Sequence, residues 1–126
     1  MQLIFEPDQS PSAITGIEGL RLRVGERWID TSFWVSARSL QPWAPRSVEA
    51  ITPEDLRELL AAGPEVILLG TGSRPRLLAP ALQALVLQQR CGLECMSNDA
   101  AARTFNVLLG DGRAVLAAFV IQQPIV

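Results

Sequence analysis

The sequence predicts a single α/β domain, and three observations carry that prediction. Residues 65–69 contain a short continuous apolar run that stops at Gly70-Thr71-Gly72, which is typical of a buried strand leading into a glycine loop. Helix-forming patterns alternate with apolar strand-like runs from residue 52 to residue 121. The length, 126 residues, suits one domain with a sizeable core, so we expect residues 1–126 to form a single domain.

The first third of the chain predicts an irregular arm followed by a β-hairpin. Residues 1–16 are rich in proline and glycine, and we expect them to form an arm that pairs at a sheet edge. Residues 20–24 alternate apolar and charged side chains, which indicates a strand with one buried face. A turn at 25–27 and a second strand at 28–36 complete the hairpin, and a proline-rich connector follows at 42–45.

The middle of the chain predicts helix, strand, helix and strand. Thr52 precedes a proline and two acidic residues, which suits a capped helix start, and the glycine-proline pair at 63–64 ends that helix. After the buried strand at 65–69, a second helix begins near residues 79–80 and a short strand follows at 93–96. A helix connects these two strands, so we expect them to be parallel.

The end of the chain predicts a third helix and a strand in the centre of the sheet. Asn98 or Asp99 is the expected N-cap of this helix, which runs to about residue 109 before a glycine turn at 110–112. The apolar run at 114–121 is long enough for a central strand, but its direction stays open.

The composition excludes several kinds of chemistry. All eleven basic side chains are arginine, and histidine, lysine and tyrosine are absent. Without histidine there is no Ser-His-Asp triad and no histidine-ligated metal; without lysine there is no Schiff base and no phosphate-binding lysine of a P-loop. The formal net charge of −2 does not favour binding to nucleic acid or to an anionic membrane surface.

The two cysteines and the N-terminal residues bear on the compartment. Cys91 and Cys95 form a C-x3-C pair without a second pair, so we predict no metal site, and we predict no cofactor. Residues 1–10 carry acids where a secretion signal carries basic and apolar residues, and no apolar run is long enough to span a bilayer. We therefore expect a cytoplasmic protein with reduced cysteines and no membrane insertion.

Several segments together resemble a known family. The match extends over about residues 14–121 and rests on Gly19, Trp43, the Gly70-Thr71-Gly72 loop and the segment 96–118. Within that last segment the most characteristic residues are Ala101, Arg103-Thr104-Phe105-Asn106 and Gly112-Arg113. The chain resembles the small α/β domain family of unknown biochemical function that includes mitochondrial complex I assembly factor 3 and an adipogenesis-associated cytosolic protein.

The resemblance implies both a fold and a kind of function. It implies a three-layer domain with a central mixed sheet, helices on one side and the N-terminal β-hairpin on the other. It also implies a mostly uncharacterised function, since the mitochondrial member is a non-catalytic assembly factor for the membrane-bound NADH dehydrogenase.

The glycine loop is the expected floor of a pocket. Gly70, Thr71 and Gly72 could bring backbone amides close to an anion, with Arg74 and Arg76 nearby. A dinucleotide-binding loop would run straight into a helix, whereas here a proline follows Arg74 and the helix begins about seven residues later. Dinucleotide binding is therefore not predicted, and glycines that simply turn the chain at a sheet edge are the structural alternative.

The opposite wall of this pocket is predicted on the third helix. Arg103 and Asn106 would form its polar side, because asparagine in the middle of a helix indicates a hydrogen-bonding task. The structural alternative is that Asn106 bonds to a neighbouring loop.

Two functions from different classes remain open. The favoured one is a non-catalytic binding or assembly-factor-like module that contacts a protein partner through the hairpin face or the 73–79 loop. The other is a small-molecule or anion-binding protein, or an enzyme, that uses the pocket at the glycine loop. We expect a protein partner, no nucleic acid, and a monomer or weak homo-oligomer.

Overall fold

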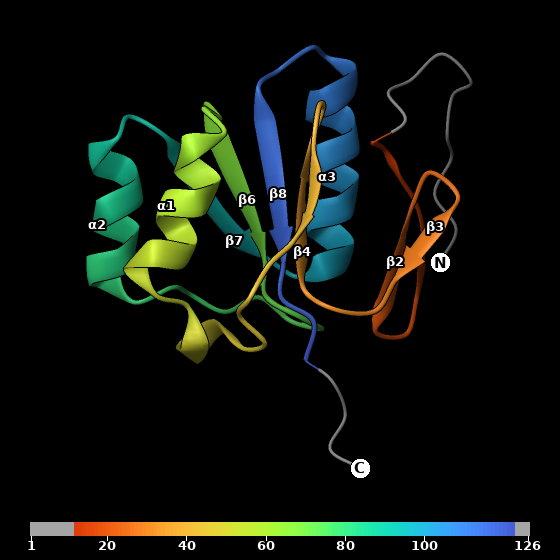
Figure 1. Ribbon diagram of the computed structural model, residues 1–126, viewed down its shortest axis with the longest axis horizontal. Helices are drawn as coiled ribbons and strands as arrows, with labels where there is room; N and C mark the ends of the chain where they lie inside the picture. Colours follow the sequence, from red (N-terminus) through yellow and green to blue (C-terminus); the bar gives the residue numbers. More distant parts are fainter. Residues whose placement is uncertain (1–11, 123–126) are drawn as a thin grey trace.

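Two β-sheets and three α-helices make up the part of the chain that the computed structural model describes, residues 12–122 (Figure 1). The elements in chain order are β1 (Ile14–Glu18), β2 (Arg21–Val24), β3 (Arg27–Ile29), β4 (Phe33–Ser36), β5 (Leu40–Pro42), the short 3-10 helix η1 (Val48–Ala50), α1 (Pro53–Ala61), β6 (Val66–Gly70), α2 (Pro80–Gln88), β7 (Gly92–Met96), α3 (Asn98–Gly110) and β8 (Val115–Phe119).

The larger sheet is mixed, and the last strand lies at its centre. Its order is β5-β4-β8-β6-β7. Strand β6 runs parallel to both β7 and β8, whereas β4 is antiparallel to β8 and to β5. The predicted α/β class, the central mixed sheet, the parallel pair around the second helix and the central position of the last strand are all confirmed.

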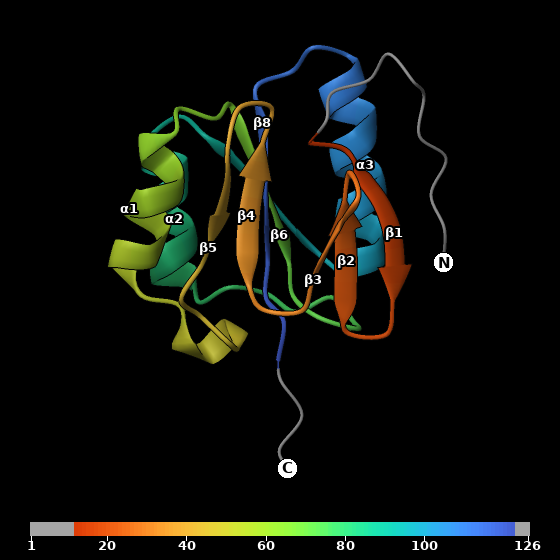
Figure 2. The same cartoon turned by 45° about the vertical axis from the view of Figure 1, so that its right-hand side comes forward.

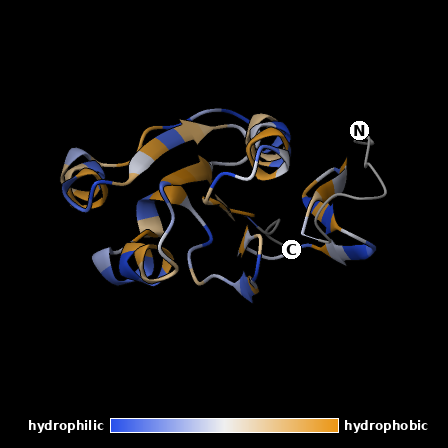
Figure 3. Ribbon diagram, turned by 90° about the horizontal axis from the view of Figure 1, so that it is seen from above, coloured by the Kyte–Doolittle hydropathy of each residue, from blue (hydrophilic) through white to orange (hydrophobic). Residues whose placement is uncertain are grey.

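The two faces of this sheet bury different elements. Successive side chains of a strand point to opposite faces, so Ile67 and Leu69 of β6 pack towards α1 and α2. Leu68, between them, packs on the other face with Ala101 and Phe105 of α3. Figure 3 shows these hydrophobic central strands between helices that are in part hydrophilic.

The expectation that the helices lie on one side is wrong for α3. A small sheet of order β1-β2-β3 lies on one side of the large sheet, and α3 lies on that same side. Helices α1 and α2 cover the opposite face (Figures 1 and 2). The cause is the strand order: the chain moves from β6 outwards to β7, then back past β6 to β8. Right-handed crossovers in opposite directions place their helices on opposite faces.

The predicted hairpin is wrong in its second strand, because residues 28–36 belong to two sheets. Strand β3 pairs with β2 in the small sheet, and β4 pairs with β8 in the large one. Between them Ser32 is buried, and its hydroxyl accepts a hydrogen bond from the Ile121 amide at 2.9 Å. This bond fixes the point at which the chain passes from one sheet to the other.

The chain also forms strands where irregular segments are expected. The predicted arm at 1–16 lies partly outside the described residues, but from Ile14 onwards it forms β1, which pairs with β2 in the small sheet. Residue 42, at the start of the proline-rich connector, belongs to β5, which is an edge strand. A proline is tolerated there because an edge strand has a neighbouring strand on one side only. The start of α1 is as predicted, with a reciprocal capping box between Thr52 and Asp55.

Candidate functional site

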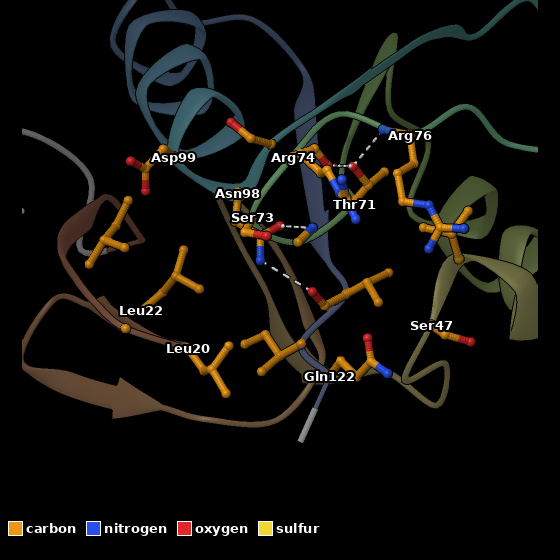
Figure 4. A pocket seen from close by; sticks show the side chains of 17 residues that line it. Leu20, Leu22, Ser47, Thr71, Ser73, Arg74, Arg76, Asn98, Asp99 and Gln122 are labelled. Atoms are coloured by element: carbon orange, nitrogen blue, oxygen red, sulfur yellow. Dashed lines mark hydrogen bonds between the residues drawn. The ribbon is translucent and has the colours of Figure 1, made fainter. Parts of the chain in front are cut away.

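A pocket of about 660 Å³ lies where β6 and β8 end. The carboxyl ends of parallel strands are the usual position of binding sites in α/β sheets. Five segments line the pocket: the β1–β2 turn region, the start of η1, the loop after β6, the start of α3 and the residues after β8 (Figure 4). The lining includes Leu20, Leu22, Thr71, Gly72, Arg74, Arg76, Asn98 and Asp99.

The loop after β6 is held by the side chain of Thr71. This residue is only 6% exposed, and its hydroxyl lies 2.8 Å from the Arg74 carbonyl oxygen, to which it donates. The Thr71 hydroxyl oxygen also accepts a hydrogen bond from the Arg76 amide at 3.0 Å. Gly72 has a φ of 108°, a conformation that favours glycine. The threonine therefore shapes the loop rather than offering its hydroxyl to a ligand.

Asn98 joins the loop, the end of β8 and the start of α3. Its Oδ1 accepts from the Gly72 amide at 3.1 Å, and its Nδ2 donates to the Val120 carbonyl at 3.2 Å. Its own amide donates to the Gly72 carbonyl at 2.8 Å. The Gly72 amide is thus already bonded within the protein, so it does not form the anion cradle that the glycine loop suggested.

Gly70 lies beneath this junction and does not line the pocket. A Cβ at position 70 would lie 2.9 Å from Cδ1 of Phe119 and would overlap Oδ1 of Asn98. The absence of a side chain at Gly70 is what allows Asn98 to approach β6.

The expected cap of α3 is corrected by the structure. Ser97 is the N-cap, and its Oγ accepts from the Ala100 amide at 3.3 Å. Asn98 is free to bond elsewhere because the cap is already made. Asp99, the other expected cap, is exposed on the pocket rim.

The two arginines of the loop differ in their partners. The guanidinium of Arg76 pairs with the carboxylate of Glu49 in η1. Arg74 is exposed, lines the pocket, and makes no ion pair with any other residue in the range 12–122. In Figure 4 both arginines lie on one side of the pocket and Asp99 on the other.

The small sheet supplies an apolar wall. Leu22 is 1% exposed and belongs to the core, whereas Leu20 on the same strand-turn segment is 52% exposed. Gly19 makes the turn before it with a φ of 61°. A leucine is thereby presented at the rim, across the pocket from the loop arginines (Figure 4).

Comparison with known proteins assigns the family. Residues 14–120 match the family described as protein of unknown function (DUF498/DUF598). The chain belongs to this family.

Several solved structures of similar proteins have the same fold as this member of the DUF498/DUF598 family. A Bordetella parapertussis protein is 30% identical with a TM-score of 0.82, over 92% of this chain and 100% of that one. A Xanthomonas campestris protein is 35% identical with a TM-score of 0.81, over 96% of this chain and 92% of that one. A Bordetella pertussis protein described as an Mth938-like domain, 24% identical with a TM-score of 0.81 over 98% and 95% of the two chains, shares the fold.

A curated relative of the DUF498/DUF598 chain carries a membrane-related name. It is the "13 kDa major membrane protein" of Francisella tularensis subsp. holarctica (strain LVS), 33% identical over 70 residues. The match covers 54% of this chain and 55% of the relative, so it spans about half of each. Within residues 12–122, none of the helices is long and apolar enough to pass through a bilayer.

The two helix residues predicted for the opposite wall of the pocket do not line it. Arg103 and Asn106 lie about 8 and 12 Å further along the helix axis than Asn98. Asn106 instead bonds to the backbone of Ile14 at both ends of its amide, with Oδ1 accepting and Nδ2 donating at 2.8 Å each. The structural alternative is therefore the right one, although the partner is strand β1 and not a loop. Arg103 is exposed on α3.

Sequence reasoning missed Asn98, Asp99 and Leu20 as pocket residues. The first two belong to the run Ser97-Asn98-Asp99, in which each residue type is a good N-cap. A helix needs one cap, so a run of three indicates that at least one of them has another task. Leu20 carries no comparable signal, because its exposure depends on how the small sheet sits against the large one.

The ionisable groups on the pocket lining are few. They are two guanidiniums and one carboxylate, and the residues described contain no cluster of metal-binding side chains. The two cysteines are free thiols away from the pocket lining. Burial raises the pKa of the Cys91 thiol, which disfavours the reactive thiolate. The described lining thus combines a few charged side chains with apolar ones.

Proposed function

We propose that this protein is a non-catalytic binding module, of the assembly-factor kind, that holds another protein at the pocket between the β1–β2 turn and the 71–76 loop. The observation that carries the proposal is the rim of the pocket. An exposed leucine, Leu20, lies across the pocket from Arg74, an arginine that makes no ion pair within residues 12–122, while the Thr71 hydroxyl and the Gly72 amide are bonded internally.

Exposed leucine and arginine side chains around one pocket are typical of a protein-binding surface. Arginine is enriched at the residues that dominate binding energy, and an apolar side chain at a rim gains from being covered. Leu77, just after the loop, is a second exposed leucine, with 81% of its surface accessible. The resemblance to a family that includes an assembly factor supports the same proposal.

The proposal places the protein in the cytoplasm as a monomer or weak homo-oligomer. Cell fractionation followed by immunoblotting tests the location, and recovery in the membrane fraction after a high-salt wash would contradict it. That control is needed because the Francisella relative is named as a membrane protein.

Binding of a small molecule or anion is the second candidate. One observation favours it: the pocket has a volume of about 660 Å³, within the range of small-ligand sites, and Arg74 faces it without an ion pair in the described part of the chain. Native mass spectrometry of protein purified from its own cytoplasm would detect such a ligand by its mass.

Site-specific photo-crosslinking in the native cell separates the two. A photoreactive phenylalanine analogue replaces Leu20 in one strain and Val107, 62% exposed on α3, in the control strain. We expect one discrete protein adduct from position 20 and none of that mass from position 107. If position 20 gives no adduct, or the same adducts as position 107, the protein-binding proposal is wrong.

A further inference from the structure

We propose that the pocket recognises an acidic, apolar peptide segment of its partner, with a carboxylate bound by Arg74 and a neighbouring apolar side chain covered by Leu20 and Leu22. This inference rests on the proposed function and names the chemistry of the segment that the module holds.

The charge of the pocket is divided between its two sides. Arg74 and Arg76 lie on the side of the 71–76 loop, and Asp99 lies on the other, at the start of α3 (Figure 4). The charge of Arg76 is balanced by Glu49, whereas Arg74 makes no ion pair in the part of the chain that the structure describes. A planar guanidinium matches a carboxylate with two parallel hydrogen bonds, which makes an acidic side chain its complement.

The apolar half of the pocket lies across from this charge. Leu22 and Ile17 are almost fully buried and form the base, while Leu20 rises from it to the rim with half of its surface exposed. An apolar side chain placed there would remove the rest of the Leu20 surface from water. Asp99 borders the same half and would repel a second carboxylate, so it sets the direction of the segment.

The shape of the site favours a peptide over a free small carboxylate. Sites for small molecules enclose most of the ligand's surface within mainly apolar walls. Here the rim residues Leu20, Ser73, Arg74, Arg76 and Asp99 are themselves exposed. An extended chain can cross such an open cleft and use the charge and the leucine at separate points.

Nuclear magnetic resonance titration with synthetic probes tests the inference. The probes are acetyl-Gly-Phe-Leu-Glu-Gly-Ser-amide, the same peptide with glutamine in place of glutamate, and decanoate. The proteins are the wild type, Arg74→Gln, and the matched control Arg38→Gln, whose arginine is exposed at the far β4–β5 turn. The amide spectrum of each variant also reports whether it is folded.

We expect the glutamate peptide to shift amide signals of residues 17–22, 71–76 and 97–99. Its affinity should fall about fivefold for the glutamine peptide or for Arg74→Gln, and stay unchanged for Arg38→Gln. Equal affinity for the two peptides would overturn the inference. So would decanoate binding at these residues without the peptides, which is the small-molecule outcome.

The two proposals fail in different ways. A position-20 adduct in the cell together with charge-insensitive peptide binding would leave the binding module standing and overturn the acidic segment. Absence of the adduct would overturn the module itself.

Discussion

The side chain of Asn98 accepts a hydrogen bond from the Gly72 amide at 3.1 Å, so the first residue of α3 holds the glycine loop that follows β6. A second bond, from Nδ2 to the Val120 carbonyl, ties the end of β8 to the same point. The pocket floor therefore depends on one amide side chain that connects three segments far apart in the sequence.

Replacing Asn98 with alanine should destabilise the protein. Two hydrogen bonds to backbone groups are lost at a partly buried site, so we expect the free energy of unfolding to fall by about 1–3 kcal/mol. Urea denaturation followed by circular dichroism measures the change. The matched control is Asp99→Ala, one residue further on and exposed, for which the fall should stay below about 1 kcal/mol. Equal effects of the two substitutions would contradict the role given to Asn98.

Adding a methyl group at Gly70 should be costly. A Cβ there would lie 2.9 Å from the Phe119 ring and would also displace Asn98, so Gly70→Ala should lower the free energy of unfolding by about 1–3 kcal/mol. Gly92 in the neighbouring strand β7 is the control, since its Cβ would lie no closer than 3.4 Å to Val66. Thermal melts of both variants decide the matter, and a Gly70→Ala melt no lower than that of Gly92→Ala would refute the prediction.

Asn106 should matter for the attachment of the small sheet. Its side chain bonds to both backbone groups of Ile14, a residue that is fully buried, so Asn106→Ala leaves a buried amide and a buried carbonyl without partners. Relative to the wild type, we expect Asn106→Ala to accelerate hydrogen exchange more at the amides of β1 than at those of β6. Val107→Ala, at the exposed next position, should leave both rates unchanged. If Asn106→Ala accelerated hydrogen exchange equally in β1 and β6, the substitution would act on the whole fold, and the prediction would be wrong.

The ion pair between Glu65 and Arg113 should make stability depend on acid pH. The Arg113 side chain, which donates to Glu65 at 2.6 Å, lowers the pKa of Glu65 from its ordinary value of 4.5, and the Ala114 amide assists. A lowered folded-state pKa stabilises the protein above the unfolded value, and this contribution is lost as the pH falls through the folded value.

The measurement compares melting temperatures of the wild type and Arg113→Gln across that range. We expect the wild type to melt higher at about pH 7, and the difference to shrink as the pH falls below the ordinary value of 4.5 and the carboxylate takes up its proton. A difference that grows on acidification has the wrong sign for this ion pair and would disprove it.

Local signals in the sequence predicted the parts of the fold that depend on local physics. The capping pattern at Thr52, the helix-ending glycine-proline pair and the apolar runs of β6 and β8 lie where the sequence placed them. The position of α3 could not be predicted in this way, because it follows from the strand order β8-β6-β7, which arises from long-range pairing.

The candidate site was predicted in part for the same reason. Thr71, Gly72, Arg74 and Arg76 line the pocket because they follow a strand directly, and strand ends meet at one edge of the sheet. The expectation that Asn106 lines the pocket failed because a polar residue within a helix indicates that its side chain is hydrogen-bonded, but the sequence does not identify the partner. Its partner, Ile14, is 92 residues away in sequence.

The two walls of the pocket belong to different sheets. Leu20 stands on the small sheet, and the 71–76 loop follows a strand of the large one. The join between the sheets, made by α3 and by the chain at Ser32, therefore sets the width of the opening. A substitution of Ser32 can therefore change the width of the pocket without replacing any residue that lines it.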